Sequence, residues 1–448
     1  MEFVADLHLH SKYSRAVSRD MNLETMAFWA EKKGLNILST GDWTHPLWLR
    51  EIKQELVEET QGLFKIKNGK SNLKSPLFLL SVEISSIYTQ GGKVRRIHNL
   101  VFSPSINVCE KINAELIKRA ANLSSDGRPI IGLSSESLAD LVFSIDKEAM
   151  VIPCHAWTPW FSLYGSNSGF DSIDECFGKF ADKIYGVETG LSSDPYMNWQ
   201  IKELNTRSIL SFSDAHSPAK MGREATVFKI KDDKSNLKSI NYNEIRLAIM
   251  QDKKAKLKIA YTIEFYPEEG KYHFTGHRNC SYVQTPDQTR KNGTICPKCK
   301  RPLTVGVMHR VEDLAKKDFP KELTKYNSND IKWNLDPKKI HPPFVKLVPL
   351  NEIIAEALGS GVASLKVKDL YDKLVLTLGN ELNVLLHENL GRIEKEAGIK
   401  VAEGIKKVRS GDIDILPGFD GQYGIVKIWK EELSKKENDI TSQLGIDF

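Results

Sequence analysis

Short apolar runs rich in β-branched residues recur through the first half of the chain. They cover residues 3–9, 36–41, 77–85, 97–102, 150–156, 184–189, 208–214 and 225–230. Segments of helical composition separate several of them, such as residues 23–34, which close on a glycine typical of a helix C-terminus. Strands that alternate with helices predict parallel βαβ units, and seven or eight such units predict a barrel. We therefore expect an α/β barrel over residues 1–260.

The pattern changes after about residue 260. Residues 261–326 carry three cysteines and many basic side chains, residues 327–344 are rich in Asn, Pro and Lys, and the following segments are helical and close on glycines. We expect a small basic module over 261–326 and a linker over 327–344. We also expect a mainly α-helical C-terminal domain over 345–430, with two short extended runs near its end, and a charged tail over 431–448.

Length and composition exclude several classes of protein. The chain has 448 residues, of which 41% are apolar and 27% charged, which excludes a disordered segment and a disulfide-stabilised mini-protein. No run approaches the ~20 apolar residues of a membrane span, and the N-terminus MEFVADLHLH is polar where a signal peptide is apolar. Three of the six cysteines have metal-ligand spacing and three are scattered, as in a reducing compartment. We expect a soluble, cytoplasmic protein with no membrane partner.

Positive charge is concentrated in one region. Residues 229–340 contain 24 Lys+Arg and 14 Asp+Glu, although the net charge of the whole chain is only +5. Residues 271–301 contain seven basic residues and one acidic residue, with Tyr272, Phe274 and Tyr282 among them. A basic segment with interleaved aromatic rings suits a phosphate backbone and unstacked bases. A solvated, lysine-rich surface explains the charge equally well.

Ionisable residues gather at the C-terminal ends of the apolar runs, where α/β barrels build their active sites. His8 and His10 are two residues apart on an expected strand, so both side chains lie on one face, as two ligands of one ion must. A single histidine of this kind is more often structural. The recurrence at later strands is what indicates a metal centre. The recurring residues are Asp6, Asp42, His45, Glu83, His98, His155, Glu188, Asp214 and His216.

These motifs carry a family resemblance. DLHLHSKYS, TGDWTH, the isolated Glu83, IHNLV, PCHAW and SDAHSP resemble the ordered motifs of the PHP (polymerase and histidinol phosphatase) superfamily. The resemblance implies a distorted (β/α)7 barrel whose trinuclear metal centre hydrolyses phosphoesters. It implies a first ion held by His8, His10, Glu83 and Asp214, which would be the catalytic residues, a second held by Glu83, His98 and His155, and a third held by Asp42 and His216.

The third ion site departs most from the family pattern. Many members place a histidine shortly after the His-x-His motif, where this chain has Tyr13, Ser14 and Arg15. They also often have Asp-His where this chain has Asp42 and Trp43. Mixed nitrogen and oxygen ligands suit several metals. We expect two or three divalent ions in the barrel, and the sequence does not choose among Zn²⁺, Mn²⁺, Fe²⁺ and Mg²⁺.

A second metal site is expected in the basic module. His277 and Cys280 are followed after 15 residues by Cys296 and Cys299, which is the spacing of a structural zinc site. Four protein ligands leave no open position for catalysis, so we expect one structural Zn²⁺. His273 lies four residues before His277 and is the alternative fourth ligand. The alternative for the cysteines is burial as small apolar side chains.

The order of the parts resembles one family within the superfamily. A PHP-like barrel, then HRNC and CPKCKRPLTVGVMHRVEDL, then PPFVKLVPLNEIIAEALG and PGFDGQYG are similar to endonuclease Q from residue 1 to about 430. The resemblance implies a DNA-repair enzyme that nicks DNA 5′ of uracil, hypoxanthine, xanthine or an abasic site. The alternatives are a PHP phosphoesterase acting on a small phosphomonoester or as an exonuclease, and a non-catalytic DNA-binding adaptor. The basic module argues against the small-molecule enzyme, and the intact ligand set argues against the adaptor.

An enzyme that reads a damaged base inside a duplex must extrude it into a pocket. We expect that pocket in the loops after Glu83 and His155, and ordinary loop packing is the alternative for each residue. The pocket candidates are Ser85, Ser86, Tyr88, Trp157, Trp160 and Phe161. The expected phosphate contacts, for which a solvated surface is the alternative, are Arg95, Arg96, Arg278, Arg290, Lys291, Lys298 and Arg301. Damaged DNA is the expected partner, and the sequence leaves a sliding clamp and the oligomeric state open.

Overall fold

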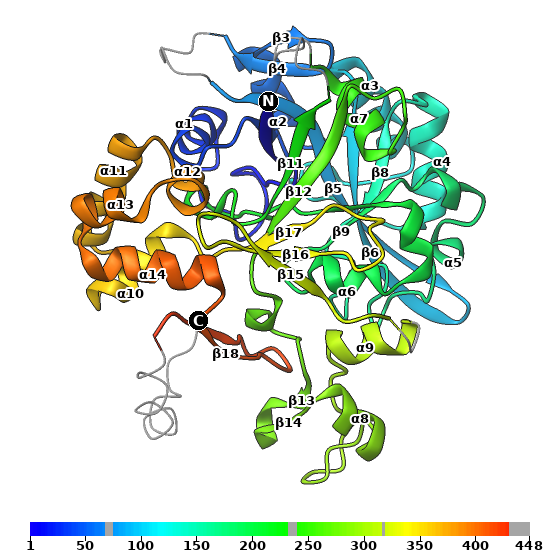
Figure 1. Ribbon diagram of the computed structural model, residues 1–448. Helices are drawn as coiled ribbons and strands as arrows, with labels where there is room; N and C mark the ends of the chain where they lie inside the picture. The colour runs from blue at the N-terminus through cyan, green and yellow to red at the C-terminus, as the bar shows by residue number, and fades with distance from the viewer. Residues whose placement is uncertain (68–74, 232–239, 316–318, 430–448) are drawn as a thin grey trace.

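The computed structural model describes residues 1–67, 75–231, 240–315 and 319–429. Figure 1 shows a barrel of strands and helices, a small module that projects from it, and a group of C-terminal helices beside α1 (Leu23–Lys33). The expected charged tail over 431–448 lies outside the described residues. Within the described ranges, no helix is both long and apolar enough to cross a membrane.

The barrel is built on strands that pair in order around its centre. These are β1 (Glu2–Asp6), β2 (Ile37–Ser39), β5 (Leu77–Gln90), β6 (Lys93–Ser103), β8 (Met150–Pro153), β9 (Gly186–Glu188) and β10 (Ser208–Leu210). β1, β2 and β5 are parallel, β9 and β10 are parallel, and a bridge between Leu9 and Ala215 connects the residues after β1 and β10. The predicted α/β barrel is therefore confirmed.

The strands are not all parallel, as the alternation with helices had predicted. β5 and β6 form one long antiparallel hairpin that turns at Gly91 and Gly92, both of which have positive φ. β6 also pairs antiparallel with β8. A parallel connection needs a dozen or more residues for its crossover, and the turn between β5 and β6 is far shorter. This hairpin is the distortion that separates the barrel from a regular one.

Helices cover the barrel and begin and end where the sequence provides capping residues. They are α1, α2 (Pro46–Glu55), α3 (Ile106–Lys118), α4 (Ser135–Ile145), α5 (Ile173–Phe177), α6 (Pro195–Trp199) and α7 (Tyr242–Ile249). In α1, the Asn22 side chain accepts a hydrogen bond from the backbone of Thr25, and Gly34 ends the helix at φ 90°. Leu23, Met26 and Ala30 form its buried face.

Further strands extend the main sheet beyond the barrel. β11 (Ala225–Ile230) pairs antiparallel with β1, followed by β12 (Leu257–Glu264), β17 (Phe344–Lys346), β16 (Lys332–Leu335) and β15 (Leu323–Tyr326). The short strands β3 (Leu56–Thr60), β4 (Leu63–Ile66) and β7 (Ile130–Ile131) pair at the other side. Residues 327–344, expected to be a linker, thus include β16 and belong to the sheet, because buried Ile331 and Phe344 anchor them.

The basic module contains β13 (Thr275–His277), β14 (Tyr282–Gln284), α8 (Pro286–Asn292) and α9 (Val307–Leu314). α9 attaches it to the barrel, since the guanidinium of Arg310 donates to the carbonyl oxygens of Tyr164 and Phe170, each at 3.0 Å. At its other side lies the hairpin of β18 (Asp414–Leu416) and β19 (Ile425–Lys427), where Asp420 accepts from the backbone of Arg278 at 2.7 Å. The two extended runs expected near the end of the chain are this hairpin.

The C-terminal domain is helical, as predicted. It consists of α10 (Leu350–Leu358), α11 (Leu365–Leu378), α12 (Glu381–Leu386), α13 (Leu390–Ala397) and α14 (Ile399–Ser410). It docks on α1 through a buried ion pair of 2.7 Å between Lys33 and Glu381, whose carboxylate also accepts from the hydroxyl of Tyr371. These contacts explain why Figure 1 has the domain beside α1.

Candidate metal centre and DNA-facing surface

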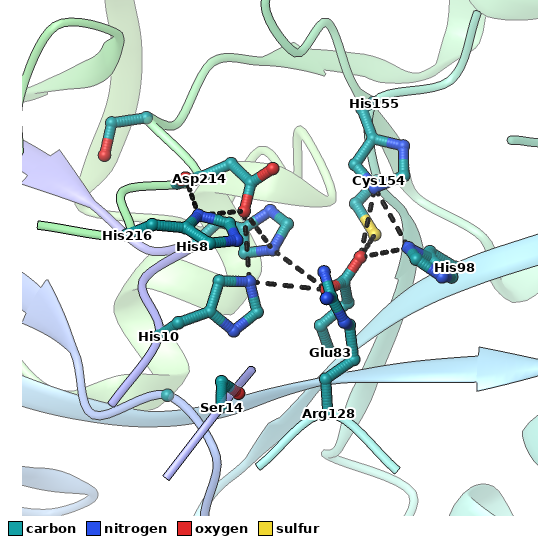
Figure 2. A network of polar contacts seen from close by, with 12 residues as sticks. His8, His10, Ser14, Glu83, His98, Arg128, Cys154, His155, Asp214 and His216 are labelled. Carbon is teal, nitrogen blue, oxygen red and sulfur yellow. Dashed lines mark hydrogen bonds and ion pairs between the residues drawn. The ribbon is translucent and has the colours of Figure 1, made fainter. Parts of the chain in front are cut away.

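Glu83, in the middle of β5, lies at the centre of a polar network (Figure 2). Its Oε2 lies 3.3 Å from His10 Nε2 and 3.2 Å from Arg128 Nη1. Its Oε1 lies 3.0 Å from His155 Nε2 and also contacts His98 Nδ1. The two oxygens of one carboxylate therefore face two separate groups of imidazoles, which is the arrangement of a carboxylate that bridges two ions.

The first group surrounds Glu83 Oε2. Asp214 Oδ1 lies 3.0 Å from His10 Nε2 and 3.6 Å from His8 Nε2. His8 is fully buried, and its Nε2 has no hydrogen-bond partner among the described residues. A buried ring nitrogen without a partner costs free energy unless something binds it. Because it faces two carboxylates and a second imidazole, a divalent cation fits this group.

The second group surrounds Glu83 Oε1. His98 Nδ1 and His155 Nε2 are 3.2 Å apart, and both face this oxygen. The thiol of Cys154 lies 3.6 Å from the same oxygen. Two imidazole nitrogens and a carboxylate are suitable ligands for a second cation. The sequence had marked Cys154 only as one of the scattered cysteines.

Carboxylates behind the histidines orient their rings. Glu188 Oε1 lies 2.9 Å from His8 Nδ1, and Glu188 Oε2 accepts from the backbone N–H of His155 at 2.7 Å. Asp42 Oδ1 lies 3.1 Å from His10 Nδ1. Such partners fix the tautomer of a metal-binding imidazole and aim its other nitrogen at the ion. The position of Glu188 at a strand end was noticed in the sequence, but this role was not predicted.

Asp42 and His216, the two expected ligands of a third ion, lie in different groups. Asp42 Oδ2 accepts hydrogen bonds from Ser11 N at 2.6 Å, Ser11 Oγ at 2.7 Å and Ser14 Oγ at 2.9 Å. His216 instead lies with Asp214 and His10, its Nδ1 2.8 Å from the carbonyl oxygen of Asp214. The structure therefore does not assemble the expected third site.

Charges in the centre stabilise one another. Burial alone would raise the pKa of Glu83, but the neighbouring His98 ring and the Arg128 guanidinium outweigh burial and hold that pKa well below its usual range. Burial alone would lower the pKa of His8, but Glu188 and Asp214 raise it well above the ordinary value. The carboxylates thus remain anionic and require nearby positive charge. Arg128 was not singled out from the sequence, because nothing in its local pattern marks it.

The backbone at the centre is strained. Asp42, His155, Phe161 and Asp214 have φ values of 49°, 32°, 63° and 47°. Residues other than glycine rarely adopt this left-handed region, and they persist in it only where the surroundings enforce it. Such strain clusters at functional sites and cannot be read from the sequence.

The first expected base-pocket loop does not exist. β5 continues as a strand to Gln90, so Ser85, Ser86 and Tyr88 lie within it and not in a loop after Glu83. The two-residue alternation of a strand puts Ser85 on the same face as Glu83, whereas Ser86 and Tyr88 face the other side. The apolar run was predicted to end at Ser85, and pairing with β6 extends it.

The second expected loop divides into a core residue and a lining of a cavity. Trp157 is fully buried, and its ring N–H donates to Asn198 at 2.8 Å, so it packs in the interior. A cavity of about 380 Å³ is lined by Arg96, Thr158, Trp160, Phe161 and Tyr272. The Phe161 ring lies 4.8 Å from the ring of His98, which connects this cavity to the metal-ligand groups. Tyr272 belongs to the basic aromatic segment but was not predicted to line the pocket.

The expected phosphate contacts are in different states. The Arg95 guanidinium contacts the carbonyl of Gly169 and stacks 4.1 Å from the ring of Phe170. Arg290 pairs with both Asp287 and Glu312. The Lys298 ammonium donates to the carbonyl of Cys280 at 2.7 Å. The side chains of Arg278, Lys291 and Arg301 are exposed on the module.

The module brings together the four expected zinc ligands. His277, Cys280, Cys296 and Cys299 have their ligand atoms within 4.8 Å of one another. His277 Nδ1 lies 3.2 Å from the sulfur of Cys299. His273 lies elsewhere, buried next to the ring of Phe274. The geometry thus favours His277 over His273 and fits a tetrahedral zinc site.

Two comparisons with protein sequences extend beyond single motifs. Residues 349–412 match the family described as the MJ0043 C-terminal domain. The uncharacterized protein MJ0043 of Methanocaldococcus jannaschii is 33% identical over 322 residues, which are 70% of this chain and 37% of that protein. This chain thus spans little more than a third of that relative's length. The uncharacterized protein YqxK of Bacillus subtilis is 28% identical over 441 residues, 94% of this chain and 98% of that one.

Two solved structures resemble the whole chain. The lesion-specific endonuclease PfuEndoQ of Pyrococcus furiosus has a TM-score of 0.79 and 31% identity, with all of both chains covered. A complex of endonuclease Q with a 27-mer duplex carrying an abasic lesion at the active site has a TM-score of 0.79 and 32% identity, covering 97% and 98% of the two chains. Both cover the barrel, the module and the helical domain. On this whole-chain similarity, the protein belongs to the endonuclease Q family.

Proposed function

We propose that the protein is a metal-dependent endonuclease that nicks duplex DNA 5′ of deaminated bases or abasic sites. Family membership supports action on damaged DNA, since one family structure holds a duplex with an abasic lesion at its active site. The observation that carries the proposal is the contact of Phe161 with His98, because it joins the aromatic cavity to the ligand groups around Glu83. A base flipped into that cavity would bring its own backbone phosphate to the metal end of the barrel.

Two divalent ions would be held around Glu83, one by His8, His10, Glu83 and Asp214 and one by Glu83, His98 and His155. Ions at such a pair of sites activate a water nucleophile and neutralise charge on the phosphodiester. The protein's own task is to hold the imidazoles through Glu188 and Asp42 and to bind the flipped base against the aromatic rings. Stacking on such rings contributes ~1–3 kcal/mol per base.

The module and its zinc would hold the flanking duplex. Its exposed basic residues Arg278, Lys291 and Arg301 suit phosphate contacts that carry no sequence information. Uracil, hypoxanthine, xanthine and abasic nucleotides share weakened or absent pairing, which lowers the cost of extrusion. Recognition of the lesion would therefore lie in the barrel, and general affinity in the module.

The test uses end-labelled duplexes that each carry one uracil, hypoxanthine, xanthine or abasic nucleotide, with Mg²⁺, Mn²⁺ or Zn²⁺ supplied separately. The proposal expects a single nick immediately 5′ of the lesion, lost on chelation, and no cut in the undamaged duplex. Progressive loss of nucleotides from an end would favour an exonuclease. Hydrolysis of a small phosphomonoester without any cut in DNA would contradict the proposal.

A further inference from the structure

The turn that ends at Arg128 is fixed against the metal-ligand groups by three hydrogen bonds. Gly127 N donates to the carbonyl of Tyr13 at 3.0 Å, and the Thr44 hydroxyl donates to the carbonyl of Gly127 at 3.2 Å. The backbone N–H of Arg128 donates to Asp126 Oδ1 at 3.1 Å. This turn is therefore a fixed part of the site, and it places the Arg128 side chain reproducibly.

Gly127 lies directly against Asp42 and fills the space in front of it. A Cβ at this position would come within 2.4 Å of Asp42 Oδ2 and 2.5 Å of Ser14 Oγ, so only glycine permits this approach. The same oxygen already accepts three hydrogen bonds from Ser11 and Ser14, and Oδ1 faces the ring of His10. Asp42 thus has no free oxygen, and a third ion does not fit there.

The Arg128 guanidinium approaches Glu83 from the side of Asp42 and Ser14 (Figure 2). Its Nη1 lies 3.2 Å from Glu83 Oε2, the oxygen that also faces His10, and a quarter of the side chain is exposed. Among the described residues, Glu83 is its only hydrogen-bond acceptor. A guanidinium has five N–H donors and a permanent charge, so most of its donors remain for a ligand.

We propose that Arg128 supplies the third positive charge of this centre and binds a non-bridging oxygen of the scissile phosphate, so that the barrel works with two ions and one guanidinium. The fixed fork of arginine matches the oxygens of a phosphate better than the point charge of a lysine does. The inference rests on the proposed phosphodiesterase function, and it makes Arg128 a catalytic residue in place of a third metal site at Asp42.

The first test counts metal without using activity. The full chain is saturated with Mn²⁺ or Zn²⁺, freed of unbound metal, and assayed by mass spectrometry for ions per chain. We expect two ions in the barrel and one zinc in the module, for the wild type and for Arg128→Ala alike. A third barrel ion in the wild type would overturn the proposal. Loss of an ion from Arg128→Ala would also overturn it, because Arg128 would then act only by holding Glu83.

The second test measures turnover on a lesion duplex and on bis(4-nitrophenyl) phosphate. Arg128→Ala should lower kcat by about 10²–10³-fold, as loss of one transition-state donor does, with a smaller change in KM. Arg128→Lys should keep part of the activity, and millimolar guanidinium should restore part of it to Arg128→Ala. Wild-type kcat in Arg128→Ala would contradict the proposal, and thermal unfolding of each variant shows that it is folded.

The matched control is Arg15→Ala, which removes a neighbouring guanidinium. Arg15 is three-quarters exposed, and its Nε is 3.6 Å from Asp126. We expect wild-type kcat in this variant, and an equal loss would mean that charge in general, and not Arg128, matters. If the wild type cut no lesion duplex, the proposed function would fail. The metal count and the turnover of the small diester would still decide the role of Arg128.

Discussion

The two metal-binding regions are assembled in opposite ways. The ligands around Glu83 come from separate strands between His8 and Asp214, and His8, His10 and Glu83 are buried. The module ligands all lie within residues 277–299, and Cys280 and Cys299 are accessible to solvent. The barrel groups also have carboxylates behind their histidines, whereas the module has a lysine bonded to a carbonyl of its own loop.

The difference separates chemistry from structure. The barrel positions its ligands with its own core, so removal of an ion leaves the fold and abolishes the reaction. The module has little core of its own, so binding of its ion contributes folding free energy directly. An open centre with few protein ligands per ion can accept a phosphate, and a closed four-ligand site cannot.

Asp214→Asn should have the largest effect on cleavage. It removes a ligand charge from the first group while the barrel core stays intact. Loss of several kcal/mol of charge stabilisation corresponds to a fall in kcat of at least about 10³-fold. Single-turnover cleavage of an abasic duplex measures this. Asp140→Asn is the control, because Asp140 is 60% exposed and forms only a surface ion pair with Lys179. Wild-type turnover in Asp214→Asn would remove Asp214 from the centre.

Chelation should distinguish the two regions in one sample. We expect a chelator to abolish cleavage while about one zinc per chain remains bound, because the four closed ligands of the module exchange their ion slowly. Circular dichroism should show unchanged helix and strand content, and added Mn²⁺ or Zn²⁺ should restore cleavage. A loss of the module zinc before the loss of activity would reverse the assignment of the two sites.

Cys296→Ser should act on the module alone. We expect one zinc fewer per chain and faster hydrogen exchange over residues 275–305, with the barrel protected as in the wild type. DNA binding should weaken by about tenfold or more at moderate salt. Cys109→Ser is the control, since Cys109 is a fully buried barrel cysteine outside the ligand groups. A zinc content equal to that of the wild type would refute the module site.

The ligand spacings were readable from the sequence because they depend on local geometry. The two-residue spacing of His8 and His10 requires only a strand, and the module spacing requires only a short knuckle. The whole-chain order of motifs also identified the α/β barrel, the helical domain and the family. Asp42 was misread as a ligand because its contacts with Ser11 and Ser14 form only once the loop after β1 has folded.

The remaining features depend on long-range contacts. Arg128 reaches Glu83 across 45 positions of sequence, and nothing near it in the chain marks it. The strand over Ser85 to Gln90 exists because β6 pairs with it, and Trp157 is in the core because Asn198 accepts its N–H. The sheet segment within 327–344 was hidden by Asn and Pro, since its few buried apolar residues are spread among them.

Replacing Arg290 and Lys291 by alanine should have the smallest effect. Lys291 is exposed, but Arg290 is already paired with Asp287 and Glu312, so its gain from a phosphate is reduced. The slope of affinity against salt on a log–log plot changes by ~0.9 for each phosphate that the protein no longer neutralises, so we expect a slope shallower by about 1. Matched and uracil-containing duplexes should weaken equally. A selective loss of lesion preference would move base recognition to the module.

The division of labour is tested most sharply by single-turnover cleavage of an abasic duplex across a range of enzyme concentrations, for wild type, Asp214→Asn and Cys296→Ser. We predict that Cys296→Ser reaches the wild-type rate constant at saturating enzyme but needs a higher concentration to do so. Asp214→Asn should bind with unchanged affinity and cut at least about 10³-fold more slowly. A saturating rate constant for Cys296→Ser as low as that of Asp214→Asn would contradict the account, because the module would then belong to the chemistry.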